Sequence, residues 1–425
     1  MKPNAVFVIN YFHPDYASTG QILTDLCKYL QKDFNITVIA ELPPMMRDSQ
    51  DTSKYQYDRL EDINIIRIRL PQVDKGNKLS RLRYIVSYFF SALYILLKQK
   101  KIDFIYTISQ PPILGGLIGS IGKILKRTKH IYNVHDFNPE QIEAVGFNKN
   151  KLLIEAARWL DKLNCQISDH VITVGHDMQD TLSHRFNDRN VPANSVIHNW
   201  TDEKDITPLD KSHPEVAKFI NELNLTNKFI VMYSGNMGLY YDLENLIRFT
   251  DQFKDCEDLV FLFIGEGAVK NKMMEHVTQH RIQQVEFIGF QDKSRIKYSL
   301  NAADLHLVVN QKGIKGVSVP SKIYGVMAAG KPVLGVLEEG SEAYRLVKAS
   351  GCGELVEPQQ YEEFVQAIKK MYFMDRAHLK DMGRQGRVYL DQHLQRETAM
   401  EKYRYLLNNI SSIHNSRQEG AEMNL

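Results

Sequence analysis

The sequence is poor in cysteine. Its 425 residues include four cysteines, and none belongs to a CxxC pair: Cys27, Cys165, Cys256 and Cys352. Disulfide frameworks and structural zinc sites need closely spaced cysteines. The sequence therefore argues against both, and a reducing cytoplasm is the expected compartment.

Two nucleotide-binding motifs and a leader pattern are also missing. No GxxxxGK[ST] loop occurs, which argues against a P-loop ATPase. No GxGxxG follows the first β-rich run, which argues against a dinucleotide-dependent dehydrogenase. The N-terminus leads after one lysine into that run, residues 5–9, and does not resemble a signal peptide.

Positive charge is concentrated in one part of the chain. The net charge is only +2, yet residues 75–130 hold eleven Lys or Arg against one Asp. Within this block, residues 84–97 form an uncharged apolar run of fourteen residues. A membrane span needs roughly twenty such residues, so the run is too short to cross a bilayer.

An apolar helix with basic ends suits the surface of an anionic membrane. The residues expected to face the lipid are Arg81, Arg83, Lys98, Lys100 and Lys101. The alternative is a buried core helix whose ends are basic. No nucleic-acid-binding motif accompanies the block, so nucleic acid is not an expected partner.

Short β-rich runs alternate with helical stretches almost throughout. Such alternation predicts parallel sheets with helices on both faces. Two similar α/β domains are expected, separated by the polar stretch 199–214. The β-rich runs are 5–9, 36–39, 66–70, 104–108, 131–134 and 170–174, then 229–233, 259–264, 285–288, 305–309, 333–336 and 354–356.

Ligands of parallel sheets bind beyond the carboxyl ends of the strands. Small-residue turns follow several runs, at 19–20, 234–238 and 265–267, where the backbone can approach a phosphate or a sugar. A plain turn is the alternative for the first of these. His135 and Asp136 follow the run at 131–134, with a satisfied structural histidine as the alternative.

The segment 316–335 is the most informative. A polar loop leads into a predicted helix of about three turns, with Pro320 in its first turn and Gly330 as its left-handed stop. The positive end of a helix attracts phosphate. Lys312, Lys315 and Lys322 around that end would neutralise a diphosphate, although a lysine at a helix start is often simply solvated.

Taken together, these segments resemble a family 4 glycosyltransferase of the GT-B fold, closest to the bacterial surface-polysaccharide branch. The resemblance covers nearly the whole chain, through segments 11–20, 135–140 (HDFNPE), 233–238 (YSGNMG), 263–267 (FIGEG), 287–291 (FIGFQ), 303–304 and 319–332. It implies two Rossmann-like doubly wound domains with a cleft between them. The implied divisions are 1–200 for the acceptor, 215–390 for the donor, and a helix within 391–410, at 392–407, that returns to the first domain.

The resemblance also implies roles for individual residues. His135 sits near the reacting sugar, and Gly20 lets its loop approach the donor phosphates. The implied donor-binding residues are Gly20, Asn236, Phe290, Gln291, Lys312, Ser321 and Lys322. Phe290 and Gln291 line the base pocket, whereas Lys312, Ser321 and Lys322 contact the diphosphate. No metal or other cofactor is implied.

Two departures from the family pattern are visible. Gly325 stands where many members have a ribose-binding glutamate, and Val317 replaces its usual acidic partner. The arginine and lysine that commonly follow the glycine turn of the donor domain are missing, and Tyr241 lies near the lysine position. The contact to the ribose is therefore unassigned.

The implied activity is retaining transfer of a sugar from a nucleotide-sugar, expected to be a UDP-sugar. The expected acceptor is a polyprenyl-linked saccharide at the cytoplasmic face of the cell membrane, in exopolysaccharide, capsule or lipopolysaccharide synthesis. The alternatives are a nucleotide-sugar 2-epimerase of the same fold, an inactive glycosyltransferase-like scaffold and, as the weakest fit, a sugar phosphorylase.

Overall fold

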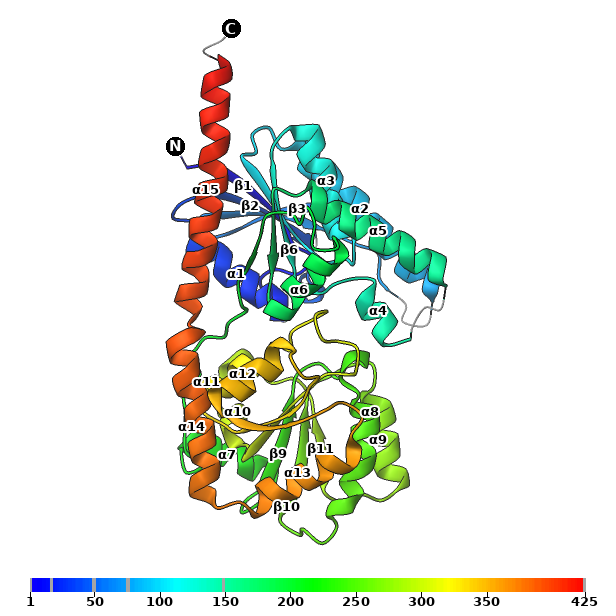
Figure 1. Ribbon diagram of the computed structural model, residues 1–425, viewed down its shortest axis with the longest axis vertical. Helices are drawn as coiled ribbons and strands as arrows, with labels where there is room; N and C mark the ends of the chain where they lie inside the picture. Colours follow the sequence, from blue (N-terminus) through cyan, green and yellow to red (C-terminus); the bar gives the residue numbers. More distant parts are fainter. Residues whose placement is uncertain (1, 16–17, 48–50, 74–76, 147–149, 423–425) are drawn as a thin grey trace. The chain divides into compact units, whose positions relative to one another are not determined.

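The computed structural model describes residues 2–15, 18–47, 51–73, 77–146 and 150–422. Its helices and strands form two compact α/β units (Figure 1). Unit 1 comprises Met1–Glu140, Asn148–His198 and Glu397–Leu425. Unit 2 comprises Gln141–Phe147 and Asn199–Arg396.

Unit 1 is built on an eight-stranded sheet of order β3-β4-β2-β1-β5-β6-β7-β8. All described pairings are parallel except that of β3 with β4 at one edge. The strands are β1 (Asn4–Val8), β2 (Asn35–Glu41), β3 (Tyr55–Leu60), β4 (Ile63–Ile68), β5 (Phe104–Ile108), β6 (Lys129–Val134), β7 (His170–Thr173) and β8 (Asn194–Val196). The six predicted strands of this half are confirmed, with their ends shifted by up to three residues.

The two strands missing from the prediction are edge strands. β3 reads YQYDRL and is half exposed, so it lacks the apolar run that marked the others. β8 has three residues, none of them fully buried. An edge strand has one neighbour and does not need a continuous apolar sequence.

Helices of unit 1 follow the strands in the usual alternation. α2, α3 and α5 lie side by side on one face of the sheet (Figure 1). The helices are α1 (Ser18–Leu30), the short η1 (Pro44–Met46), α2 (Lys78–Lys98), α3 (Leu114–Lys126), α4 (Glu140–Ala144), α5 (Lys151–Ile167), α6 (His176–Arg185) and α15 (Arg396–Glu422). Of α4, only its first residue, Glu140, is grouped with unit 1, and the rest of this helix belongs to unit 2.

Unit 2 has a six-stranded parallel sheet of order β11-β10-β9-β12-β13-β14. Its strands are β9 (Phe229–Ser234), β10 (Leu259–Ile264), β11 (Val285–Ile288), β12 (Leu305–Val309), β13 (Val333–Val336) and β14 (Gly353–Val356). Numbered from β9, this is the doubly wound order 3-2-1-4-5-6. All six predicted strands of this half are confirmed, so both sheets have the predicted α/β architecture.

The helices of unit 2 cover both faces of this sheet. They are α7 (Pro214–Glu222), η2 (Leu239–Tyr241), α8 (Leu243–Leu246), η3 (Ile247–Phe253), α9 (Lys270–Gln279), α10 (Lys293–Ala302), α11 (Lys322–Ala328), α12 (Glu342–Ser350), α13 (Tyr361–Phe373) and α14 (Arg376–His393). Each face carries its own apolar cluster: one gathers around Tyr233 and Phe261, and another around Ile230 and Leu262.

The helix predicted from Pro320 is shorter than expected. α11 spans seven residues and begins at Lys322. The preceding residues instead form tight turns, in which the amides of Ile323 and Tyr324 donate to carbonyls three residues back, at Pro320 and Ser321. Gly330 does adopt the left-handed conformation, with a φ of +62°, so the predicted stop is confirmed.

The predicted final helix at 392–407 also needs correction. α14 extends to His393, and a break at Leu394 and Gln395 separates it from α15. From Glu397 onward α15 belongs to unit 1, where Tyr403 and Leu407 are fully buried. The four cysteines are buried free thiols.

Candidate functional site

Two glycine turns of unit 2 pack backbone against backbone beyond the carboxyl ends of β9 and β10. Gly235 and Gly265 have φ angles of +140° and +135°. A Cβ on Gly265 would lie 2.1 Å from the Gly235 carbonyl oxygen. The amide of Met237 donates to the Glu266 carbonyl at 2.8 Å, which ties the turns together. Only glycine permits this approach.

Lys322 lies directly over the first of these turns. A Cβ on Gly235 would sit 2.9 Å from Lys322 Cε. The Lys322 ammonium lies 3.7 Å from the ring centroid of Tyr241 and 4.9 Å from that of Tyr233, in cation–π geometry. We call Tyr233, Tyr241 and Lys322 the lysine cradle.

The lysine cradle perturbs the titration of its lysine. Among the described residues, no carboxylate forms an ion pair with Lys322. The residue keeps some solvent exposure. Its ammonium group, however, contacts the faces of two tyrosine rings, in the positions that water or a carboxylate would normally occupy. Burial without a counter-charge lowers the pKa of Lys322 to about 7. The site therefore lacks the anion that a lysine normally pairs with.

The predicted base-pocket and sugar-side residues flank the same turns. Phe290 is 61% exposed, and its ring would lie 3.3 Å from a Cβ on Gly265. Gln291 uses its side-chain amide to donate to the Gly289 carbonyl at 3.2 Å. Asn236 is exposed at the tip of the first turn. The structure thus brings Asn236, Phe290 and Lys322 around one pair of turns.

The loop after β12 adds the remaining predicted residues. The Gln311 amide donates to the Tyr240 carbonyl at 2.8 Å, which places this loop beside the lysine cradle. Lys312 is exposed, and Ser321 is half-buried directly before α11. The Lys315 amine donates to the Glu339 carbonyl at 2.6 Å, so this lysine is already engaged.

This arrangement sits where the strand order reverses. β9 and β12 are neighbours in the sheet, and the helices that follow them lie on opposite faces. Ligands of doubly wound sheets bind in the crevice at this position. The cradle is assembled from residues within or after these two strands: Tyr233 lies in β9, Tyr241 in η2 and Lys322 in α11.

In unit 1, Gly20 lies in the first turn of α1 rather than in a turn before it. It is buried against the first strand-end loop, since a Cβ would lie 3.2 Å from the carbonyl group of Tyr11. The Thr24 hydroxyl donates to the Gly20 carbonyl at 2.7 Å. The backbone of Tyr11 therefore lies so close to Gly20 that a larger residue would be crowded at this position.

His135 follows β6 and is buried, with 7% of its surface exposed. Its amide and that of Asp136 both donate to the Ser109 hydroxyl at 3.1 Å. Its Nε2 lies 3.2 Å from the Asn133 side-chain nitrogen. Burial lowers the pKa of His135 to about 4, so the ring is neutral near pH 7.

An ion cluster that the sequence prediction missed supports the loop after His135. Arg185 of α6 is almost fully buried, pairs with Asp161 at 2.5 Å and also pairs with Glu140. Its guanidinium stacks 4.2 Å from the Phe137 ring centroid and donates to the Asn138 carbonyl at 3.1 Å. We call Arg185, Asp161 and Glu140 the buried ion cluster. Its members are far apart in the chain, and no local pattern marks them.

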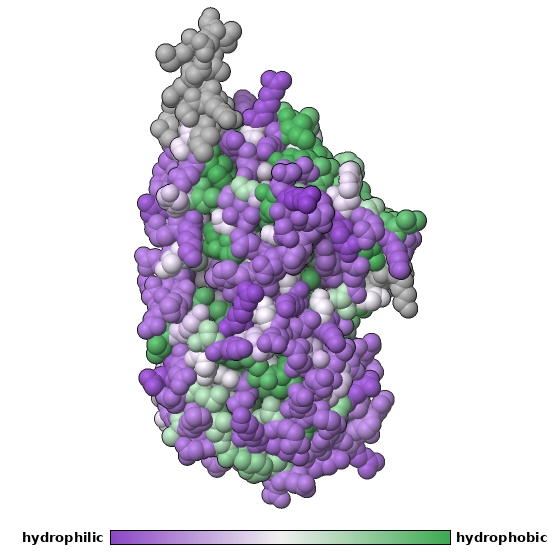
Figure 2. All heavy atoms as spheres, viewed as in Figure 1, coloured by the Kyte–Doolittle hydropathy of each residue, from purple (hydrophilic) through white to green (hydrophobic). Residues whose placement is uncertain are grey.

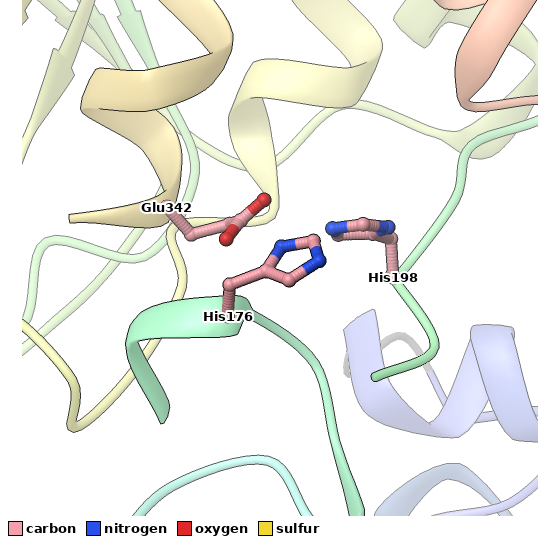
Figure 3. Close-up of side chains that lie close together, drawn as sticks. All are labelled: His176, His198 and Glu342. Carbon is pink, nitrogen blue, oxygen red and sulfur yellow. The ribbon is translucent and has the colours of Figure 1, made fainter. Parts of the chain in front are cut away.

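Two histidines of unit 1 were also not predicted. Figure 3 shows His176 in the first turn of α6 and His198 on the segment after β8; their ring centroids lie 5.3 Å apart. Glu342, drawn in the same figure, is a buried residue at the start of α12 in unit 2. The expectation that no metal is needed stays a prediction.

Comparison with known families covers both halves of the chain. Residues 19–205 match the family model described as Glycosyltransferase Family 4, and residues 215–389 match the one described as Glycosyl transferases group 1. The chain belongs to the family 4 glycosyltransferases. The predicted family and the predicted enzyme class, a sugar transferase, are thereby confirmed.

Relatives of this glycosyltransferase include two bacterial proteins. It is 26% identical over 408 residues to the probable glycosyltransferase WbjE of Pseudomonas aeruginosa, covering 94% of this chain and 96% of that protein. It is 24% identical over 411 residues to the putative colanic acid biosynthesis glycosyl transferase WcaI of Escherichia coli K12, covering 94% and 98%.

Solved structures support the fold of the glycosyltransferase. Sucrose-phosphate synthase from Thermosynechococcus elongatus superposes with a TM-score of 0.74 at 17% identity, over 97% of this chain and 100% of that chain. Anabaena Alr3699/HepE in complex with UDP and glucose gives 0.70 at 14% identity, over 96% and 100%. These likenesses establish the GT-B fold.

The basic residues expected at a membrane lie at the two ends of α2 and beyond it. Arg81, Arg83, Lys98, Lys100 and Lys101 are all exposed. None of the helices in the described part of the chain combines the length and apolarity of a membrane span. α2 buries Tyr88 and Leu96 yet exposes Phe90, so it is neither wholly a core helix nor wholly a surface helix.

Proposed function

We propose that the glycosyltransferase uses a UDP-sugar as donor and a polyprenyl-linked saccharide as acceptor, in the synthesis of a bacterial surface polysaccharide. The lysine cradle carries the donor half of this proposal. It holds a cation that no carboxylate of the described residues pairs with, at the switch point of unit 2 and directly over two closely packed glycine turns. The UDP complex of the structural relative Alr3699/HepE and the colanic acid role in the name of WcaI support donor and pathway class.

The proposed donor contacts follow from charge. When the bond between C1 and phosphate breaks, negative charge grows on the diphosphate. Lys322, Lys312 and the amides leading into α11 would stabilise it, with the Ser321 hydroxyl as a further donor. Phe290 and Gln291 would hold the base, and Asn236 would face the diphosphate or the sugar. No metal is required in this scheme, because the cations are supplied by lysines.

The proposed reaction retains the anomeric configuration of the sugar. The acceptor hydroxyl attacks on the face that the diphosphate leaves, and a donor phosphate oxygen takes its proton. His135, neutral through burial, would hydrogen-bond a sugar hydroxyl, since an imidazolium would instead oppose the cationic sugar of the transition state. Gly20 would let its loop approach the donor phosphates.

Membrane docking at the cytoplasmic face completes the proposal. α2 presents the exposed side chains of Leu82, Val86 and Phe90 between its two basic ends. Apolar side chains flanked by lysine and arginine favour the interface of an anionic bilayer. The docked enzyme would then reach its lipid-linked acceptor at the membrane surface where the lipid is anchored.

A thermal-shift panel tests the donor assignment. UDP, GDP and several UDP-sugars are added to the full chain and to Lys322→Met. A ligand at a hundredfold excess over its Kd stabilises the folded protein by about 2.7 kcal/mol. We expect this stabilisation when UDP or a UDP-sugar is added to the wild type, and we expect none with Lys322→Met. If no nucleotide raises the Tm, the donor proposal is wrong. Incubating the active UDP-sugar without acceptor checks for epimer formation, the alternative reaction.

Vesicle flotation tests the docking proposal. We expect the wild type to float with vesicles of equal parts phosphatidylglycerol and phosphatidylcholine. A variant with serine at Arg81, Arg83, Lys98, Lys100 and Lys101 should remain with the soluble fraction, since each basic residue near the surface contributes about 1 kcal/mol. Unchanged flotation of that variant would refute docking through these residues.

A further inference from the structure

α3 packs on the sheet of unit 1 through a side that consists mostly of glycine. Gly115, Gly116, Gly119 and Gly122 are all buried, and an added Cβ at Gly119 would collide with the His130 ring at 1.9 Å. Ile118 and Ser120 share this buried side, and Ile118 is the one large apolar side chain of α3 that is fully buried. Ile124 and Leu125 are each 61% exposed. α3 thus has an apolar outer face.

α2, on one side of α3, has an apolar outer stripe. Its exposed apolar side chains recur at intervals of three or four residues, which places them along one side of the helix. They are Leu79, Leu82, Val86, Phe90 and Tyr94. The opposite side of α2 supplies the buried residues Tyr88, Ala92 and Leu96.

α5, on the other side of α3, repeats this arrangement. Leu152, Ala156 and Trp159 are exposed at the same helical spacing, and Leu153 is exposed beside them. Leu160 and Leu163 continue the stripe and are half-buried. Scattered exposed apolar residues are ordinary on soluble proteins, whereas apolar stripes on two helices that flank a third with exposed apolar residues are not.

Hydrogen bonds hold the three helices in one layer. At their carboxyl ends, the Lys126 amine of α3 donates to the Leu97 carbonyl of α2 at 3.2 Å. On the other flank, the Lys123 amine donates to the Ile167 carbonyl of α5 at 2.7 Å. Figure 2 shows apolar side chains gathered over this part of unit 1. We call the outer sides of α2, α3 and α5 the three-helix face.

The charges around the three-helix face are predominantly positive. α2 and α3 contain no Asp or Glu. On α5 the exposed Glu155 pairs with Arg158, and Asp161 is buried in the ion cluster. Lys98, Lys100 and Arg127 are exposed at the carboxyl-terminal edge. A second copy of this face would oppose like charges, whereas an anionic lipid surface complements them.

We infer that α2, α3 and α5 together form a single membrane-docking face, with Trp159 of α5 seated among the lipid headgroups. This inference deepens the proposed docking and rests on it: α2 is one of three lipid-facing helices. Tryptophan favours the headgroup layer because its ring is apolar and its N–H is polar. The partner is the surface of a bilayer that carries anionic lipid.

Tryptophan fluorescence of the full chain tests the face directly. The sequence holds two tryptophans; Trp159 is 64% exposed, whereas Trp200 is only 4% exposed. With vesicles of equal parts phosphatidylglycerol and phosphatidylcholine, we expect the emission to move to shorter wavelength. Trp159→Phe should remove that shift while the protein still floats with the vesicles.

A paired substitution measures the contribution of α5. Leu152→Ser combined with Leu153→Ser should weaken vesicle partitioning at least about tenfold, since two apolar side chains leave the lipid. The matched control is Phe373→Ser on α13 of unit 2, which is also strongly exposed and should leave partitioning unchanged. Circular dichroism verifies that each variant is folded.

Two results would overturn the inference. One is flotation of the wild type without any emission shift, which would mean that α5 does not meet lipid. The other is absence of vesicle binding together with a dimer that the Leu152→Ser, Leu153→Ser variant dissociates, which would assign the face to a second copy. UDP binding, measured without vesicles, reports on the donor proposal separately, so failure of one is distinguishable from failure of the other.

Discussion

At the scale of single residues, Lys322 is the most unusual group in unit 2. Two tyrosine faces occupy the place of its counter-ion. A ring face offers a quadrupole but no full negative charge, so it compensates only part of the cost of burying the ammonium. Tyr241 stands near the position where the family commonly has a lysine, and here it faces a lysine from another element.

The pH dependence of donor binding should reveal this arrangement. With a pKa of about 7 in the free enzyme, Lys322 loses its charge as the pH rises through neutrality, and a bound diphosphate restores it by raising that pKa. We expect UDP affinity to fall between about pH 6 and pH 8, with proton uptake on binding. Titration calorimetry in buffers of different ionisation enthalpy measures both.

Lys322→Arg is the matched control for that dependence. Arginine keeps its charge throughout this range, so the fall in affinity should be absent in this variant. A wild type whose proton uptake and pH profile match those of the arginine variant would contradict the assignment.

Lys322→Met should lower kcat by roughly 10²–10³-fold, as loss of one transition-state contact does.

In unit 1, Arg185 is a buried cation that, unlike Lys322, is paired with carboxylates. Arg185→Met would leave the Asp161 and Glu140 carboxylates without their shared cation in a buried setting. Removing one partner of a buried pair costs about 3–5 kcal/mol. Urea unfolding should show this loss. The control Arg384→Met removes an exposed arginine that pairs within its own helix, where we expect less than about 1 kcal/mol.

At the scale of elements, the glycine turns depend on the register of two parallel strands. β9 and β10 pair along their length, with Ser234 opposite Ile264, so the two turns emerge level with each other. Both the backbone contact and the position of Lys322 above it follow from that register. A side chain in either turn would separate the strand ends.

Gly265→Ala should therefore damage the donor site selectively. Its Cβ would meet the Gly235 carbonyl oxygen, and its backbone would be strained at a φ of +135°. We expect a loss of about 1–3 kcal/mol in stability and little remaining UDP binding. Gly289→Ala is the control, because its Cβ meets nothing closer than 3.6 Å. Equal thermal shifts with UDP in both variants would show that the turns do not contribute to binding.

α15 is an element of unit 1 although it comes last in the chain. Tyr403 accepts a hydrogen bond from the Asn133 side chain at 2.9 Å, and Leu407 is fully buried. Leu407→Ala should destabilise unit 1 by about 2–5 kcal/mol. Tyr405→Ala on the same helix removes a 73% exposed side chain and should change little. Urea midpoints of the two variants test the difference.

At the scale of the whole molecule, buried neutral histidines couple stability to pH. Burial lowers the pKa of His130 to about 3, and those of His135 and His306 to about 4. In the unfolded chain these rings charge below about pH 6.5. The unfolded state then binds more protons, so their contribution is complete above that pH and is lost as the pH falls toward 4.

Acid titration of unfolding should show this loss. Each histidine contributes a slope of up to about 1.4 kcal/mol per pH unit between pH 6.5 and its folded pKa. His130→Gln should reduce the slope for unit 1. A stability that stays constant from pH 6.5 to 4.5 would refute the assignment of neutral buried rings.

The sequence by itself determined the strand ladder of both units, because a strand buried on both faces must be continuously apolar and its turns need small residues. It also determined the family, because the family motifs occur in contiguous segments after strands. The donor-binding roles of the residues in those segments stay a prediction. The sequence did not predict three features: the half-exposed β3, the three-residue β8 and the true start of α11. Edge strands and tight turns leave no periodic pattern.

Only the tertiary structure decided which of those residues meet. The lysine cradle joins β9, η2 and α11, and the buried ion cluster joins residues that adjoin three different helices. Their energies depend on burial and on distances between segments far apart in the chain. The same holds for the three-helix face: the apolar run of α2 was visible in the sequence, but the glycine side of α3 and the packing beside α5 decided which side chains stay exposed.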